Sequence, residues 1–171
     1  SSAPSTSIAP VCADLARALD YRAHPGHYRA LTELTDASLL ARAMAFMATT
    51  PACRNQAYNV TNGDVFRWEQ MWPLVADYFK LKVGPVRALT LATWMADKEP
   101  VWQLVVARHK LEPRRLDDLA LWSFADFVFR QSYDVMSSTS KLRLAGFHNM
   151  IDTRSMLFDQ LDQYRKARLL P

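Results

Sequence analysis

The chain has 171 residues, of which 50% are apolar and 22% are charged, with a formal net charge of +4; a chain of this length can bury about 70% of its unfolded surface, so we expect one packed domain. Lys and Arg are mixed with acidic residues throughout, which favours an ordinary solvated surface over a nucleic-acid-binding or membrane-binding patch. With only two cysteines, Cys12 and Cys53, the chain is expected to hold reduced thiols and no disulfide framework. It has no apolar run of about 18 residues, so we expect no membrane span and a location in the cytoplasm.

The N-terminal region predicts a flexible start followed by a helix. Residues 1–7 are rich in Ser, Thr and Pro, so we expect a single domain over 8–171 after a flexible segment. The apolar spacing of Val11, Leu15, Ala18 and Leu19 predicts an amphipathic first helix. Residues 21–23 are compatible with a short extended piece before the turn formed by His24, Pro25 and Gly26.

The next region predicts a capped helix and one strand. Thr35 and Asp36 are typical N-cap residues, and they precede a helix with apolar residues at 39, 40, 43, 44 and 47 that ends at Pro51. Residues 56–60 predict the clearest strand of the chain, and Asn62-Gly63 predicts a turn after it. Asp64 is placed to cap the following helix, which carries apolar residues between 66 and 79.

The second half is predicted to be mainly helical. Residues 82–86 favour a second short strand, and residues 91–97, 100–109 and 116–130 predict helices. A serine pair at 137 and 138 is expected to cap a short helix ending at Gly146, and the last helix begins at Asp152 or Thr153. One or two strands cannot form a stable sheet alone, so we expect them to pair outside this chain or with a second copy.

The distribution of glycine limits nucleotide binding. The four glycines occupy positions 26, 63, 84 and 146, far apart in the sequence. A dinucleotide pyrophosphate requires several small residues in one strand-to-helix turn, where backbone amides can approach it. No such turn is possible in this sequence, and we expect it to bind no cofactor by itself.

Several segments resemble one enzyme family. The segment Asn59-Val60-Thr61-Asn62-Gly63-Asp64, followed by Val65-Phe66-Arg67-Trp68 and Trp72, resembles extended short-chain dehydrogenases/reductases related to progesterone 5β-reductase and iridoid synthase. Residues 35–43, 137–148 and the closing Leu169-Leu170-Pro171 resemble further segments of that family in the same order and spacing. The resemblance covers residues 8–171.

The resemblance is to the C-terminal half of such an enzyme. It implies an α/β lineage, here mostly α: a helical substrate-binding half with one or two short strands, lacking the nucleotide-binding Rossmann half. In the family the first half holds NADPH and supplies a catalytic Tyr and Lys, and the second half closes over the substrate as an apolar lid. NADPH is therefore expected only if a Rossmann half completes the site. Tyr78 and Lys82 have the catalytic Tyr-x-x-x-Lys spacing, but they align with a non-catalytic part of the family, and we expect a structural role.

The family's pocket aromatics lie on the stretch that matches residues 116–130. We therefore predict a substrate-binding site formed by Trp122, Phe124, Ala125, Phe129 and Ser132. The alternative is that these aromatic residues belong to the core. Because four aromatics within eight residues cannot all face one side of a helix, some must line a cavity, an interface or solvent. No catalytic residue is predicted, and His24 and His27 suggest a turn rather than a metal site.

Three functions are compatible with the sequence. The first is the substrate-binding half of an NADPH-dependent reductase of conjugated carbonyl compounds, either as a fragment or as a split subunit. The second is a stand-alone, cofactor-independent protein that binds a hydrophobic small molecule or acts as a cyclase or isomerase. The third is a non-catalytic interaction module. The expected partners are an apolar small molecule and either a Rossmann-half partner or a second copy in a homodimer.

Overall fold

A computed structural model describes residues 9–12 and 17–171 of the chain. The predicted flexible start at 1–7 and Leu15 of the predicted first helix lie outside these residues. Residues 9–12 are helical, but Leu19 begins a strand, so the prediction of a helix reaching Leu19 is wrong. The chain divides into two compact units.

The first unit comprises Ser1–Ala30, Arg67–Tyr133 and Asp159–Pro171. Its described elements include two strands, a 3-10 turn and several helices. In chain order they are β1 (Leu19–Arg22), α2 (Pro25–Arg29), α4 (Trp68–Tyr78), β4 (Val83–Arg87), α5 (Leu91–Met95), α6 (Glu99–His109), η2 (Leu116–Asp118), α7 (Trp122–Phe129) and residues 159–166 of α9 (Thr153–Lys166).

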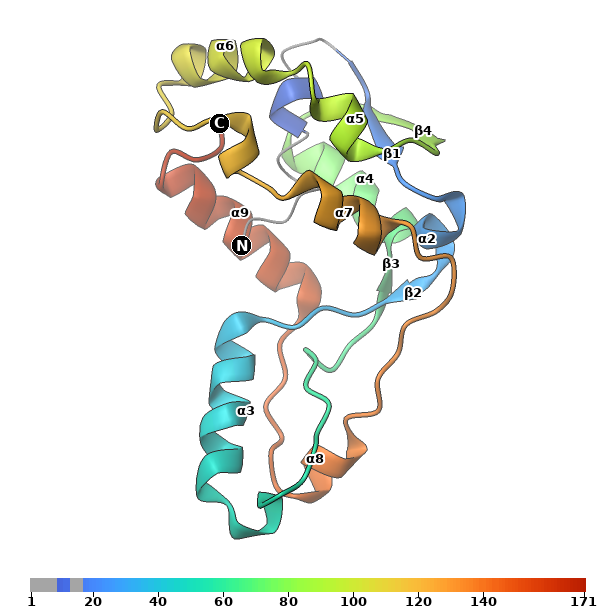
Figure 1. Ribbon diagram of the computed structural model, residues 1–171, viewed down its shortest axis with the longest axis vertical. Coiled ribbons are helices and arrows are strands. Elements are labelled where there is room, and N and C mark those ends of the chain that lie inside the picture. The colour runs from blue at the N-terminus through green and yellow to red at the C-terminus, as the bar shows by residue number, and fades with distance from the viewer. Residues whose placement is uncertain (1–8, 13–16) are drawn as a thin grey trace. The chain divides into compact units, whose positions relative to one another are not determined.

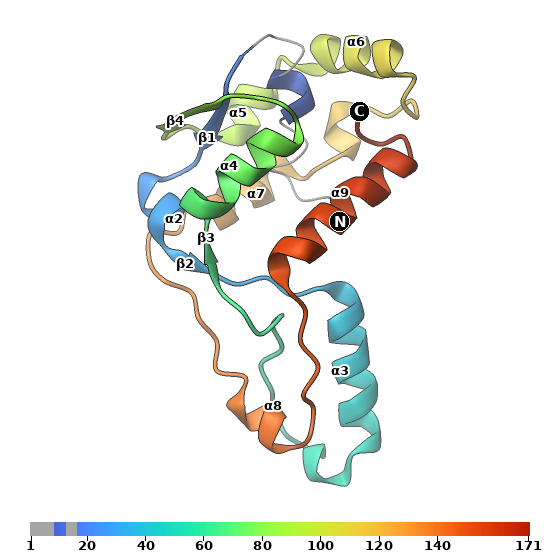
Figure 2. The same cartoon turned by 180° about the vertical axis from the view of Figure 1, so that it is seen from behind.

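The two strands of this unit pair with each other in parallel. Leu19 is in register with Val83, and Tyr21 is in register with Val86, with an irregularity between them. The predicted second strand at 82–86 is confirmed, but the expectation that strands pair only outside this chain is wrong. Strand β4 lies 64 residues after β1, so no local signal revealed the pairing. In Figures 1 and 2, α4 lies on one side of the strand pair, and α5 and α7 lie on the other.

Aromatic side chains form the centre of this unit. The Tyr21 ring lies 5.1 Å from the Trp72 ring in an edge-on arrangement and 6.2 Å from the Phe129 ring. The Trp72 indole N–H donates to the Leu19 carbonyl at 3.0 Å, which satisfies its only polar atom in the interior. Strand β1, helix α4 and helix α7 therefore share one core.

The second unit comprises Leu31–Phe66 and Asp134–Phe158. Its elements are β2 (Leu31–Thr32), α3 (Ala37–Thr49), η1 (Pro51–Cys53), α8 (Ser140–Leu144) and residues 153–158 of α9, and β2 is hydrogen-bonded to β3 (Phe66–Arg67). Asp36 caps α3 by accepting from the Ser38 and Leu39 amides, as predicted. Buried Leu39, Ala43, Leu142 and Phe147 form its core.

The predicted strand at 56–60 is absent: these residues have an irregular backbone. Asn62 instead joins several segments of the second unit. It is fully buried, its side-chain oxygen accepts from the Asp36 amide at 2.7 Å, and its Nδ2 donates to the Thr153 hydroxyl at 2.9 Å. The following Gly63 has a φ of +102°, so the predicted turn is present.

Two predicted helix caps are wrong. The Asp64 carboxylate does not cap the next helix; it accepts from the amide and the hydroxyl of Thr153, the first residue of α9. Ser137 does not cap α8, because its amide and hydroxyl donate to Glu33. Both carboxylates serve segments about 90 to 100 residues away in the sequence, which local patterns cannot reveal. Gly146, with a φ of +106°, follows α8 as expected.

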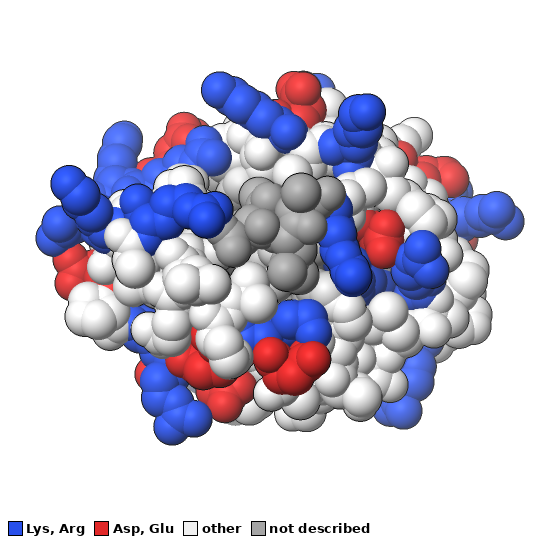
Figure 3. Space-filling view, turned by 90° about the horizontal axis from the view of Figure 1, so that it is seen from above, with Lys and Arg blue, Asp and Glu red and all other residues white. Residues whose placement is uncertain are grey.

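About half of the residues that the structure describes are helical and few are in strands, which agrees with the expected predominance of helix over strand and fits part of a short-chain dehydrogenase/reductase. Within the described ranges, no helix is both long and apolar enough to cross a membrane. Figure 3 shows Lys and Arg side chains scattered over the viewed face, with Asp and Glu between them.

Candidate substrate-binding surface

Helix α7 carries most of the predicted site residues. The predicted helix over 116–130 is interrupted: η2 ends at Asp118, and α7 runs only over Trp122–Phe129. The short helix has no side-chain cap at its first turn. Its eight residues are too few to be a stable helix in isolation, so contacts within the unit must hold it in place.

One side of α7 is part of the core. Trp122, Ala125 and Phe129 are 7%, 1% and 8% exposed. They are three and four residues apart, which places them on one face of the helix. The Phe129 ring packs edge-on against Trp68 and His27, and its carbonyl accepts from the His24 amide at 3.3 Å. Three of the five predicted site residues therefore lie in the packed interior of this unit.

The opposite side of α7 is apolar and exposed. Leu121, Phe124 and Phe127 are 70%, 56% and 59% exposed, and the two phenylalanine rings lie 6.2 Å apart. We call these three residues the α7 outer surface. The expectation that some of the aromatics face away from the core is confirmed. Leu121 and Phe127 were not among the predicted site residues, although the spacing of three residues on each side of Phe124 could have indicated them.

Ser132 follows α7 and is exposed. A Cβ added to Gly26 would stand 2.8 Å from the Ser132 Cβ, so the two residues are in close contact. Gly26 lies in the turn after β1 and is the second residue of α2. Its amide already donates to the His24 ring at 3.0 Å.

The two predicted turn histidines have different roles. His24 caps α2, whereas His27 is 2% exposed and its Nδ1 shares a 2.6 Å hydrogen bond with the Tyr21 hydroxyl. Burial, and secondarily the nearby His24, lowers the pKa of His27 to about 4, so the ring is neutral at pH 7. Burial also raises the pKa of Tyr21, which keeps its hydroxyl a donor. Among the residues that the structure describes, no group of His, Cys, Asp or Glu is arranged to hold a metal ion.

Tyr78 and Lys82 both make contacts that join elements of the first unit. The Tyr78 hydroxyl donates to the Asp162 carboxylate at 2.6 Å, and the Arg165 guanidinium lies 4.1 Å from its ring centroid. The Lys82 carbonyl accepts from the Leu19 amide. Tyr78 attaches α9 to α4, which agrees with the structural role expected from the sequence.

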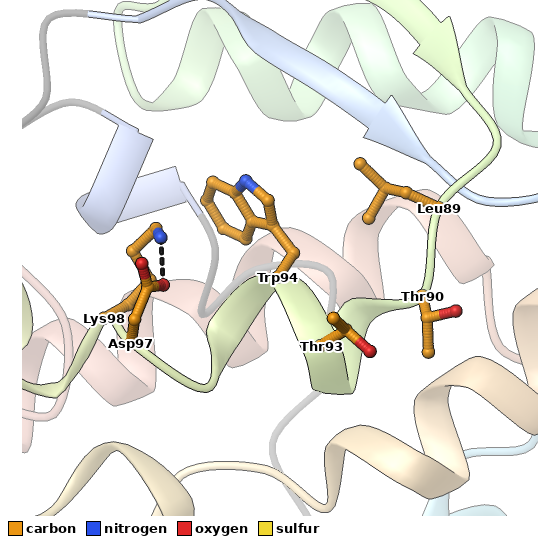
Figure 4. A pocket seen from close by; sticks show the side chains of 6 residues that line it. All are labelled: Leu89, Thr90, Thr93, Trp94, Asp97 and Lys98. Atoms are coloured by element: carbon orange, nitrogen blue, oxygen red, sulfur yellow. Dashed lines mark hydrogen bonds and ion pairs between the residues drawn. The ribbon is translucent and has the colours of Figure 1, made fainter.

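A shallow hollow of about 400 Å³ lies along α5 (Figure 4). Its lining combines apolar, hydroxyl and charged side chains, namely those of Leu89, Thr90, Thr93, Trp94, Asp97 and Lys98. Asp97 and Lys98 form an ion pair, and the Lys98 ammonium holds the pKa of Asp97 below its usual value. The buried Arg22 guanidinium lies 3.9 Å from the Trp94 ring centroid. Because its charges are paired with each other, the hollow does not indicate a ligand of particular charge.

The chain is similar to known enzymes along almost its whole length. It is 31% identical to the (S)-8-oxocitronellyl enol synthase of Antirrhinum majus and 31% identical to that of Catharanthus roseus, over 95% of this chain in each case. It is 28% identical over 94% of its length to the short chain dehydrogenase gsfE of Penicillium aethiopicum. The match spans 43%, 43% and 47% of these relatives. No protein-family model matches the chain.

The relatives share one lineage, and it is the lineage that the sequence motifs indicate. The chain corresponds to the C-terminal half of an iridoid-synthase-like short-chain dehydrogenase/reductase. The chain spans less than half the length of the curated relatives named above.

Proposed function

We propose that this chain supplies the substrate-binding part of an NADPH-dependent reductase that acts on conjugated carbonyl compounds. The observation that carries the proposal is the α7 outer surface, where two phenylalanines and a leucine face away from the core. Exposed apolar side chains gathered along one side of a helix are typical of an interaction site. Relation to short-chain dehydrogenases/reductases supplies the reaction class.

The chemistry of this surface favours an apolar and planar ligand. Phe124 and Phe127 lie 6.2 Å apart and are tilted by 31° to each other, and both side chains are more than half exposed. A conjugated enone or enal is flat and mostly apolar, so it can stack against such rings. These side chains would bind and orient the substrate and exclude water from it.

The described residues do not fit the nucleotide. The four glycines lie far apart in the sequence, so no turn offers the several small residues that a pyrophosphate requires. In the proposed enzyme NADPH is therefore held by residues other than those described here. We expect titration calorimetry of the 171-residue chain with NADPH to show no micromolar binding. Micromolar binding would mean that a nucleotide site of another form exists.

Binding of an enone tests the surface directly. We expect the chain to bind β-ionone, a conjugated enone, and the Phe124→Ala/Phe127→Ala double variant to bind it roughly ten-fold more weakly. Calorimetry and ligand-detected NMR measure the affinity. Leu144→Ala is the matched control, since Leu144 is 89% exposed but belongs to the second unit. Equal binding by both variants would contradict the proposal.

A second function uses the same surface without a cofactor. The chain would then bind a hydrophobic small molecule, or act as a cyclase or isomerase by holding it in one shape. The scattered glycines, which leave no dinucleotide-binding turn in this sequence, are the observation that favours it. Conversion of a reactive enal or enol by the chain in the absence of NADPH would distinguish this function from the first.

A further inference from the structure

Asp126 makes a two-point contact between α7 and α5. Its Oδ1 accepts from the Leu91 amide at 2.5 Å, and its Oδ2 accepts from the Ala92 amide at 3.0 Å. These are the first two residues of α5, and Thr90 before them offers no side-chain cap. One carboxylate in the middle of α7 therefore satisfies the free amides at the start of a helix 35 residues earlier in the chain.

This contact restrains rotation of α7 about its own axis. A single hydrogen bond acts as a pivot, but two oxygens bound to two consecutive amides fix the direction of the side chain. Successive helix residues are about 100° apart, so the direction of Asp126 also sets the directions of Phe124 and Phe127. Because α7 is short and uncapped, its backbone alone cannot hold this orientation.

We propose that Asp126 is a positioning residue for the α7 outer surface, acting through α5 to hold Phe124 and Phe127 in their ligand-facing orientation. The inference rests on the proposed function of that surface, but its structural part can be tested separately. Asp126 itself touches no ligand in this proposal, since only Phe124 and Phe127 would contact it.

The chemistry of the contact predicts different effects for three substitutions. In Asp126→Asn, one oxygen can still accept, but the amide nitrogen faces a second N–H donor, so one contact is lost. In Asp126→Ala both amides lose their partner. In Asp126→Glu both acceptors remain, but the longer side chain moves α7 away from α5. A residue that only stabilises the fold should be well replaced by glutamate; a positioning residue should not.

The experiment uses the 171-residue chain carrying fluorophenylalanine, with the Phe124 and Phe127 ¹⁹F signals assigned from the Phe124→Leu and Phe127→Leu variants. We expect Asp126→Asn and Asp126→Glu to shift or broaden both signals. We also expect β-ionone binding to weaken roughly ten-fold at a temperature well below the unfolding midpoint. Asp117→Asn is the matched control, because Asp117 is exposed and pairs only loosely with Arg115 at 3.7 Å.

The outcomes separate this inference from the proposed function. If the Asp126 variants are folded and leave both ¹⁹F signals and the affinity unchanged, Asp126 has no positioning role, whatever the surface does. If both signals move but neither the Asp126 variants nor the Phe124→Ala/Phe127→Ala variant affects β-ionone binding, the orientation depends on Asp126 and the proposed ligand surface is wrong. Asp126→Ala reports the loss of both contacts. If this variant does not fold, Asp126→Asn and Asp126→Glu still test whether Asp126 has a positioning role.

Discussion

Single polar residues in the interior decide how segments of each unit meet. Asn62 is the clearest case, because its side chain and backbone bond to five separate positions of the second unit, namely Leu34, Asp36, Ile151, Thr153 and Met156. In the first unit, His27 and Tyr21 share a 2.6 Å hydrogen bond within the aromatic core. Buried polar groups of this kind are costly to leave without partners, so they specify one arrangement.

The buried His27 predicts an acid-sensitive fold. Its pKa is lowered from 6.5 to about 4, so the unfolded chain binds a proton at this residue more readily than the native protein. The free energy of unfolding should therefore fall as the pH drops from about 6.5 to about 4, by up to roughly 3 kcal/mol. Urea unfolding across this range measures the change. His27→Gln, whose side-chain oxygen can still accept from Tyr21, should remove most of this slope; an unchanged slope would assign it to other groups.

Secondary-structure elements are held by carboxylates supplied from elsewhere in the chain. Asp36 caps its own helix from the adjacent position, and this was predicted from the sequence. Asp64 and Asp126 instead bond to the first residues of α9 and α5, which are distant in the sequence. Local propensity therefore located the helices, whereas the contacts that fix their starts depended on the fold.

The contact of Asp64 predicts which helix loses its first turn when the carboxylate is removed. Asp64→Ala should destabilise the protein by about 1–2 kcal/mol, because the amide and hydroxyl of Thr153 lose their acceptor. Hydrogen exchange should become faster at the start of α9 and remain unchanged at the start of α4. The reverse pattern would support the cap that the sequence suggested. Asp152→Ala is a useful comparison, since Asp152 bonds to Ser155 in the same first turn.

At the scale of the whole chain, apolar side chains remain exposed in both units. In the first unit they include Leu121, Phe127 and Tyr133, and in the second unit Leu144 is 89% exposed. Together with the relation to enzymes more than twice as long, this favours association with a second copy or with a partner. The prediction of one substrate-binding domain over 8–171 is not decided by the division into two compact units.

Self-association can be measured directly. We expect light scattering of the 171-residue chain to give the mass of a dimer at micromolar concentration, because burying apolar side chains favours association. Phe127→Ser and Leu144→Ser test one exposed residue in each unit, and the variant that restores the monomer identifies the unit that associates. A monomer for the unaltered chain at all concentrations would contradict the prediction.

The sequence by itself determined the family, because several motifs occur in one order and register from residue 8 to residue 171. It also located α3, α4, α6 and α9, whose apolar spacing is local, and it predicted that the aromatics near 122–129 could not all face one side of the helix. Only the tertiary structure decided that Trp122 and Phe129 face the core while Phe124 and Phe127 face out, that β1 pairs with β4, and that Asp64 serves α9. The physical reason is the sequence distance over which each interaction acts. Caps and apolar periodicity act within a few residues, whereas the strand pairing, the orientation of α7 and the Asp64 contact depend on segments tens of residues apart, which meet only once the chain has folded.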